Sequence, residues 1–149
     1  MARPLAKGAG ARTRARELMV QALYQKQIAG HTTAELVAQF HEQAAYARVD
    51  QAYFDEQFPA ISNSQSVLET KIGALVDRPL EQLDPVELAI LLIGIYELEA
   101  RIEIPYRVVI NEAVNLAKRF ASIEGHKYVN ACLDAAARTY REAETRAKG

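Results

Sequence analysis

The sequence contains few of the residues that mark disulfide-rich, secreted or membrane-spanning proteins. Its 149 residues include one cysteine, no tryptophan, seven glycines and five prolines. Cys132 has no second cysteine to pair with, so an internal disulfide is excluded and a reducing, cytoplasmic setting is expected. The longest dense apolar run, residues 86–98, contains two glutamates and is too short to span a bilayer. The basic N-terminus lacks the apolar stretch of a secretory signal, so neither a leader nor a membrane partner is expected.

Net charge is nearly absent as well, at -1 from 18 basic and 19 acidic side chains. This balance would argue against a polyanionic partner, but the charges are unevenly distributed. Residues 1–26 carry six basic side chains against one acidic, and residues 105–149 carry eight against five. The residues between them are strongly acidic. If the basic ends meet in space, they would form a positive patch that the average conceals.

Half of the residues are hydrophobic, enough for a core, and they recur at helical spacing. No alternating strand pattern competes, so the sequence predicts an all-α fold of about seven helices. A flexible basic arm is expected over residues 1–11, followed by a helix over about 13–29 that ends at Gly30. Thr32 or Thr33 is expected to cap a second helix running through Ala44. Pro59 is expected to stop the third.

A connector over residues 78–84 is the expected seam between two subdomains. Asp84 and Pro85 then have the pattern of an N-cap followed by proline at the first helical position, with Glu87 placed for a capping box. Residues 86–100 are apolar nearly all round, which predicts the central buried helix. Pro105 is expected to begin the next helix, and Gly125 to precede the last.

Two sets of basic residues are candidates for binding RNA. On a helical wheel, Arg12, Arg16, Val20 and Tyr24 form one row, and Arg14 lies on the opposite flank. Guanidinium groups match phosphate oxygens, and a tyrosine ring can stack on a base. A basic helix face that serves only solubility is the alternative.

The second set lies near the C-terminus, where Lys127 and Tyr128 project off the apolar stripe of the last helix. Lys118 and Arg119 end the helix before it, and a short loop joins the two. A cation beside an exposed aromatic ring suits single-stranded RNA. Alternatively, Tyr128 flanks the core with its hydroxyl in water.

Four blocks in a fixed order resemble the NusB family of bacterial transcription antitermination factors: residues 14–24 (RARELMVQALY), 88–98 (ending YEL), 105–118 (PYRVVINEAVNLAK) and 126–134 (beginning HKYVN and ending LD). The resemblance covers nearly the whole chain past the arm. It implies one RNA-binding domain over residues 12–149, built as two small three-helix subdomains around the N-terminal basic helix. It leaves the oligomeric state open, because family members occur as monomers and as dimers.

The resemblance also implies a function. Proteins of this family bind the boxA element of nascent ribosomal RNA together with NusE, a small-subunit ribosomal protein. The pair helps load other Nus factors onto the RNA polymerase elongation complex, which then resists Rho-dependent termination. No cofactor is implied.

Site residues follow from the resemblance position by position. The arginine-rich start of the family corresponds to Arg12, Arg14 and Arg16, with Thr13 interrupting the arginine run. The NusE-facing surface corresponds to Tyr24 and Glu87, although a capping box alone would explain Glu87. The family's second RNA surface corresponds to five residues near the last two helices: Lys118, Phe120, Glu124, Lys127 and Tyr128. Three further matching positions, Asn111, Glu112 and Asn130, are expected first to tie helix ends together and only second to recognise a ligand.

Other chemistries find little support. The three histidines show no metal-ligand spacing, and Cys132 falls on an apolar stripe where a core residue is expected. No phosphate-binding glycine loop or serine elbow is present, so the chain is predicted not to be an enzyme. Two alternatives remain open. One is the NusB-like RNA-binding domain of a ribosomal RNA cytosine methyltransferase, and the other is a purely protein-binding helical adaptor.

Overall fold

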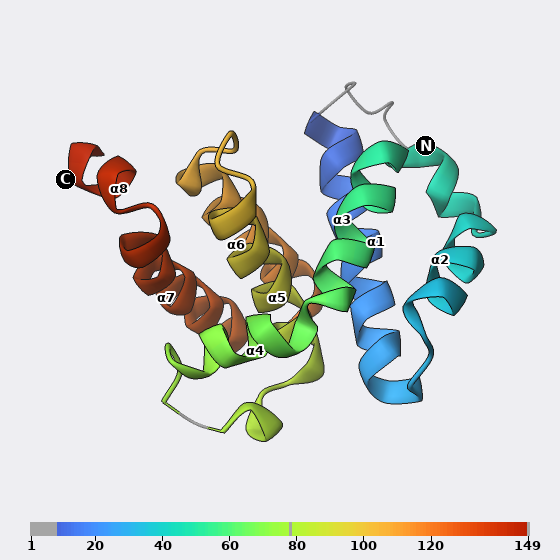
Figure 1. The fold of residues 1–149 in the computed structure, drawn as a ribbon, viewed down its shortest axis with the longest axis horizontal. Helices are drawn as coiled ribbons and strands as arrows, with labels where there is room; N and C mark the ends of the chain where they lie inside the picture. Colours follow the sequence, from blue (N-terminus) through green and yellow to red (C-terminus); the bar gives the residue numbers. More distant parts are fainter. Residues whose placement is uncertain (1–8, 78, 149) are drawn as a thin grey trace. The chain divides into compact units, whose positions relative to one another are not determined.

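The computed structural model describes residues 9–77 and 79–148. Within these residues the chain forms eight α-helices, two short 3-10 segments and no strand, which confirms the all-α prediction (Figure 1). The chain divides into two compact units, Met1–Asn63 and Ser64–Gly149.

The first unit contains α1 (Ala9–Ala29), α2 (Thr33–His41), a 3-10 segment η1 (Ala44–Arg48) and α3 (Gln51–Asn63). The predicted inward residues of α1 are all buried: Ala15, Leu18, Met19, Ala22 and Leu23. Opposite them lies an aromatic cluster in which the rings of Phe54 and Phe58 stack at 5.5 Å and Phe40 lies 6.4 Å from Phe54. Since all three phenylalanines are buried, this cluster holds α2 against α3.

Helix α1 begins earlier than predicted, so residues 9–11 of the expected arm are helical and residues 1–8 lie outside the described residues. Gly30 ends the helix as expected, with a φ of 73° that favours glycine. Thr32, not Thr33, caps α2. Its hydroxyl accepts from the Glu35 N–H while the Glu35 carboxylate accepts from the Thr32 N–H, a complete capping box. These hydrogen bonds lower the pKa of Glu35.

Two predictions about the middle of this unit are wrong. Helix α2 ends at His41, and the residues after it turn into η1 before α3 begins. Pro59 does not stop α3 but lies inside it. Because proline has no backbone N–H, the helix lacks the hydrogen bond from residue 59 to the Asp55 carbonyl. The helix continues because Phe58 and Ile61, on either side of the proline, are both buried in the core.

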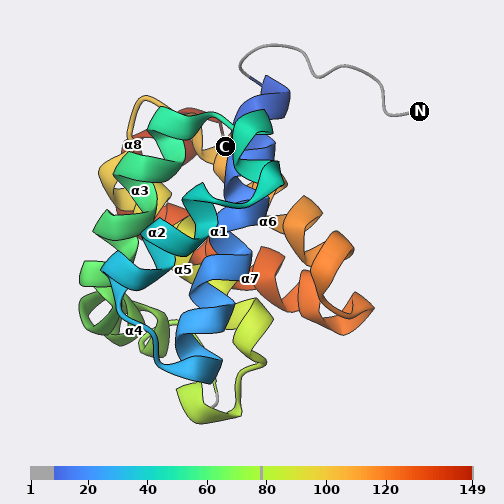
Figure 2. The same cartoon turned by 90° about the vertical axis from the view of Figure 1, so that its right-hand side faces the viewer.

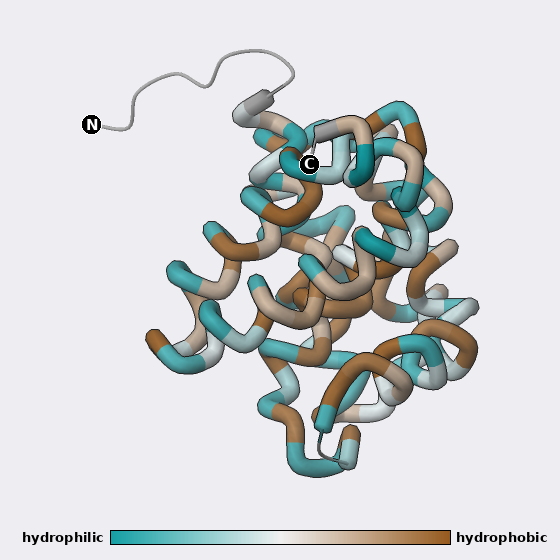
Figure 3. Tube along the Cα trace, turned by 90° about the vertical axis from the view of Figure 1, so that its left-hand side faces the viewer, coloured by the Kyte–Doolittle hydropathy of each residue, from teal (hydrophilic) through white to brown (hydrophobic). Residues whose placement is uncertain are grey.

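The second unit contains α4 (Gln65–Gly73), a 3-10 segment η2 (Leu80–Gln82), α5 (Pro85–Ala100), α6 (Tyr106–Phe120), α7 (Ile123–Tyr140) and α8 (Glu142–Lys148). Helix α5 is its centre, as predicted, since eleven of its sixteen residues are buried and α4, α6 and α7 all pack on it (Figure 2). The other helices alternate between hydrophilic and hydrophobic residues, the pattern of a helix with one buried face (Figure 3).

The observed boundary at Asn63–Ser64 lies earlier than the seam predicted at residues 78–84. Helix α4 buries Leu68 and Ile72 and packs on α5, so it belongs with the helices that follow it. The connector after it contains only the short segment η2. A proline-containing linker was therefore a weaker guide to the boundary than the apolar face of α4.

Caps explain where α5 and α7 begin. Asp84 accepts hydrogen bonds from the N–H groups of Val86 and Glu87, as predicted. Gly125 was expected to precede α7 but lies in its first turn, because Ser122 is the N-cap and accepts from the Gly125 N–H at 3.0 Å.

Helix α8 was not predicted, and a buried arginine holds it in place. The Arg141 guanidinium donates to three carbonyl oxygens at the end of α5, those of Glu97, Leu98 and Arg101, at 2.6–3.2 Å. It also pairs with Glu144 at 2.8 Å, and Glu144 accepts from the Tyr106 N–H at the start of α6. One arginine thus adds a donor to each of three carbonyls at the helix end, two of which, those of Glu97 and Arg101, also accept from a backbone N–H.

Candidate nucleic-acid interface

The arginines of α1 differ in what they contact within the first unit. Arg12 lies over the ring of Tyr53, 4.3 Å from its centroid, and its Nε lies 3.9 Å from Asp50. Asp50 also caps α3 by accepting from the Tyr53 N–H. Arg12 is still 38% exposed, so it can reach a ligand without giving up its place beside Tyr53.

Arg16, which the helical wheel places in the same row as Arg12, is enclosed by the fold. Its side chain is 3% exposed, and its Nη2 donates to the Tyr53 hydroxyl at 3.1 Å. One turn after Arg12, it packs α1 against α3 rather than facing a ligand. Burial of its guanidinium is the physical reason to remove Arg16 from the set of direct contacts.

Arg14 is the arginine of α1 that remains available. It is half-buried, and its side chain forms no hydrogen bond or ion pair with another residue of the described chain. Its guanidinium can therefore meet a phosphate without first breaking an internal contact.

The turn between α6 and α7 brings together the predicted cations of the second unit. Lys118 lies in the last turn of α6, and Lys127 lies in the second turn of α7. Both are exposed, and neither forms an ion pair with a described residue. The guanidinium of Arg119 lies 5.4 Å from the Phe120 ring centroid, so a flat cation and an aromatic ring lie side by side at the end of α6. Glu124 is also exposed here, and its carboxylate opposes an anionic ligand.

Tyr128 lies closer to the core than a surface ring would. It is half-buried and lines a cavity of about 270 Å³ together with Cys132 and residues 75–77, which follow α4. The ring flanks the core, as the alternative expected, but its hydroxyl is buried and not in water. Cys132 itself is buried, and burial raises the pKa of its thiol to about 11, which fits a core residue.

Sequence reasoning missed one residue of this turn. Ile123, the first residue of α7, is 69% exposed directly after the cap. Its residue type favours burial, so only the position of the cap, Ser122, could have revealed its exposure. Asn111 and Asn130 were expected to tie helix ends together, but both are exposed and their side chains form no hydrogen bond with a described residue. That expectation is wrong for these two.

Of the two predicted partner contacts, Tyr24 is exposed and Glu87 is not. Tyr24 is 41% exposed, and Ile28, one turn later on α1, is 60% exposed, so the two form an apolar ridge on the first unit. Glu87 is 9% exposed and faces α7. A Cβ on Gly125 would lie 2.6 Å from Glu87 Oε2, so the glycine leaves room for the carboxylate beside the first turn of α7. The dipole of α7 stabilises a negative charge at this end of the helix.

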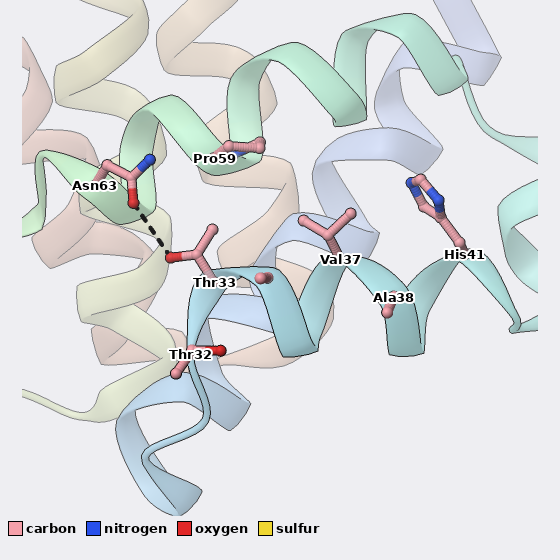
Figure 4. Close-up of a pocket in the computed structure, with 8 residues that line it drawn as sticks. Thr32, Thr33, Val37, Ala38, His41, Pro59 and Asn63 are labelled. Atoms are coloured by element: carbon pink, nitrogen blue, oxygen red, sulfur yellow. Dashed lines mark hydrogen bonds between the residues drawn. The ribbon is translucent and has the colours of Figure 1, made fainter.

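A separate groove of about 840 Å³ lies between α2 and α3 (Figure 4). Small and apolar side chains such as Val37 and Pro59 line it, and the Thr33 hydroxyl donates to Asn63 at one end. No lysine or arginine lines the groove, so it does not share the chemistry of the α6–α7 turn.

His41 stands at the far end of the groove, where Asp55 accepts from the Tyr46 hydroxyl at 2.6 Å and lies 2.7 Å from the His41 Nε2. Desolvation and the neighbouring carboxylate raise the pKa of Tyr46 to about 12. The tyrosine therefore stays protonated and keeps donating to Asp55.

Among residues 9–77 and 79–148, no group of three or more histidine, cysteine, aspartate or glutamate side chains could hold a metal ion. No helix formed by these residues is both long and apolar enough to cross a membrane.

The described residues thus form a small all-helical protein. Its helices carry basic side chains without an internal ion pair, namely Arg14 on α1, Lys118 on α6 and Lys127 on α7. A sequence model described as the NusB family matches residues 13–138. The chain belongs to the NusB family, as the ordered sequence blocks predicted.

Named relatives agree with this assignment. Transcription antitermination protein NusB of Pseudomonas syringae pv. tomato is 44% identical over 144 residues, which cover 96% of this chain and 87% of that protein. The protein of the same name from Shewanella amazonensis is 46% identical over 123 residues, covering 83% of this chain and 92% of its own length. A solved structure of T. maritima NusB matches with a TM-score of 0.75 at 25% identity, covering 85% of this chain and 90% of that one. These names describe regulation of transcription, which agrees with the prediction that the chain is not an enzyme.

Proposed function

We propose that this protein is a transcription antitermination factor that binds the boxA element of nascent ribosomal RNA together with NusE. The bound pair helps other Nus factors join the RNA polymerase elongation complex, which then resists Rho-dependent termination. Membership of the NusB family and the names of the relatives support the process. The observation that carries RNA binding is the turn between α6 and α7, where Lys118 and Lys127 stand exposed and unpaired and Arg119 lies over the Phe120 ring.

The chemistry of this turn suits a single RNA strand. Ammonium groups attract phosphates along the backbone, and the Phe120 ring and the Arg119 guanidinium offer flat surfaces on which an unstacked base can lie. Glu124 limits the affinity through its repulsion of phosphate. Tyr128 contributes in this proposal chiefly by supporting the second turn of α7, since it lines a cavity beside residues 75–77.

Helix α1, in the first unit, carries a second set of residues proposed to contact RNA. Arg14 contacts phosphate directly, and Arg12 does so from its position over Tyr53. Arg16 acts by holding α1 against α3. Each unit therefore carries basic residues that can contact RNA, and they come from both ends of the chain, as the uneven charge distribution suggests.

The proposed NusE contact is the ridge of Tyr24 and Ile28. Exposed aromatic and aliphatic side chains one helical turn apart are typical of a surface that packs on a protein. Glu87 supports this proposal only indirectly, through its contact with the first turn of α7.

Two other functions compete with this one. As the RNA-binding domain of a ribosomal RNA cytosine methyltransferase, the chain would bind RNA without NusE. Its relatives, matched over 87% and 92% of their own lengths, are antitermination proteins, which favours the proposal. A purely protein-binding adaptor would leave Lys118 and Lys127 without a role.

Titration of labelled boxA RNA, with and without NusE, separates the three functions. The proposal expects the protein alone to bind the RNA and NusE to raise its affinity. RNA binding that NusE leaves unchanged would favour the methyltransferase domain. Binding of NusE with no measurable binding of RNA, alone or in the pair, would favour the adaptor.

A further inference from the structure

The exposed face of α6 has an unusual composition for this chain. Three cations, two amides and one apolar residue make up its exposed side chains: Arg107, Val108, Asn111, Asn115, Lys118 and Arg119. Acidic residues outnumber basic ones in the chain as a whole, yet none is exposed on this helix. Glu112, the one acid of α6, is half-buried and already engaged in an interaction.

Four of these residues share one side of the helix. Arg107, Asn111, Asn115 and Lys118 follow each other at intervals of one turn, and they extend over about 16 Å at 1.5 Å per residue. The row begins at Lys118, in the proposed RNA surface, and leads away from the α6–α7 turn toward the start of α6.

The side chains of this row are free to bind a ligand. None of the four forms a hydrogen bond or ion pair with another described residue. The Arg107 guanidinium carbon lies 5.6 Å from the centroid of the neighbouring Tyr106 ring. The exposed face of α7 is different, because it carries Glu124 and Asp134, and Arg138 lies 3.7 Å from Asp134. Electrostatics therefore favour an anionic strand along α6 over one along α7.

We infer that the RNA strand bound at the α6–α7 turn continues along α6, with Asn115 and Asn111 contacting bases and Arg107 contacting a phosphate. This inference rests on the proposed RNA-binding function. Charge complementarity and continuity with Lys118 support it. An asparagine amide donates and accepts hydrogen bonds at once, so it can pair with the edge of an unstacked base, whereas a guanidinium on a phosphate carries no sequence information.

The two kinds of residue predict two kinds of defect. The double variant Asn111→Ala/Asn115→Ala should lower the affinity for single-stranded boxA RNA about fivefold or more. It should also reduce the discrimination between this RNA and versions with one base changed. Arg107→Gln should weaken binding to all of these RNAs by a similar factor and reduce the slope of log affinity against log salt by about 0.7.

Binding is measured by fluorescence anisotropy with the full chain, and thermal unfolding confirms that each variant is folded. Arg146→Gln is the matched control, since Arg146 is an exposed arginine on α8, paired with Glu142, and should change nothing. Lys118→Gln/Lys127→Gln tests the proposed RNA surface separately.

The outcomes are distinct. Suppose that the lysine variant loses affinity while the α6 variants bind every RNA like the wild type. The inference that the RNA strand continues along α6 is then overturned, and the proposed function stands. If the α6 variants weaken the binding of NusE but not of RNA, the face of α6 is a protein contact and the inference is again overturned. If the wild-type chain binds no RNA, the proposed function and the path fail together.

Discussion

The three arginines of α1 look alike in sequence but differ in environment. Arg16 is buried against Tyr53, Arg12 lies over the same ring, and Arg14 forms no hydrogen bond or ion pair with a described residue. A helical wheel assigns each residue a direction relative to its own helix. It cannot show that Tyr53, on a different helix, encloses one guanidinium and not another.

This difference gives opposite expectations for two substitutions. Arg16→Ala should lower the free energy of unfolding by about 2 kcal/mol, because it leaves the Tyr53 hydroxyl without its donor and opens a cavity. Arg14→Ala should change stability by less than about 0.5 kcal/mol but weaken RNA binding. Urea unfolding and RNA titration of both variants check this. An RNA defect in a stable Arg16→Ala protein would return Arg16 to the binding surface.

Glu124 offers a test in which binding should improve. Glu124→Gln removes an exposed carboxylate from the α6–α7 turn and should raise RNA affinity a few-fold at low salt, with a smaller gain at high salt. Anisotropy at two salt concentrations measures the effect. Glu42→Gln, which removes an exposed carboxylate from the end of α2 in the first unit, is the comparison. An equal gain from both would mean that only net charge matters.

At the scale of helices, periodicity predicted the elements well and their ends less well. The apolar positions of α1 and the all-round apolar α5 were correctly predicted, because burial imposes a helical period on the sequence. Pro59 and Gly125 were misread as boundaries. Tertiary packing keeps α3 helical through a proline, and Ser122 starts α7 before the glycine. Helix α8 depends on contacts of Arg141 that local sequence does not reveal.

Gly94 tests how closely α5 and α7 are packed. A Cβ at this position would lie 2.7 Å and 2.8 Å from the two terminal carbons of Leu133. Gly94→Ala should therefore destabilise the protein by about 1–2 kcal/mol, despite the better helix propensity of alanine. Gly73→Ala is the matched control, since Gly73 ends α4 with nothing near its Cβ, and should be neutral or slightly stabilising. Thermal unfolding distinguishes them, and equal stability of the two variants would contradict the close approach.

Arg141 tests the junction of α5, α6 and α8. Arg141→Ala removes a donor from three carbonyls and breaks the buried ion pair with Glu144, so it should cost about 3–5 kcal/mol. Arg141→Lys should recover only part of this, because an ammonium cannot reproduce the fork of donors. Chemical unfolding measures both, and hydrogen exchange should show early opening at the end of α5. A loss below 1 kcal/mol would show that the arginine is dispensable.

At the scale of the whole molecule, the near-zero net charge is less informative than its distribution. Basic residues gather in α1 and from α6 onward, and among the described side chains Arg14, Arg107, Lys118 and Lys127 form no hydrogen bond or ion pair. Family resemblance predicted most of this set, because ordered sequence blocks identify positions. The resemblance did not reveal which of the predicted site residues are buried. Arg16 and Glu87 are buried by helices distant in the sequence, which local sequence does not show.

The most direct test of the account is the salt dependence of boxA RNA binding by the wild type and by Lys118→Gln/Lys127→Gln. If Arg12, Arg14, Lys118 and Lys127 all contact phosphate, the wild-type slope of log affinity against log salt should be about -3. The double variant should bind more weakly, with a slope that is shallower by about 1.4. A variant with the affinity and slope of the wild type would contradict the placement of RNA at the α6–α7 turn.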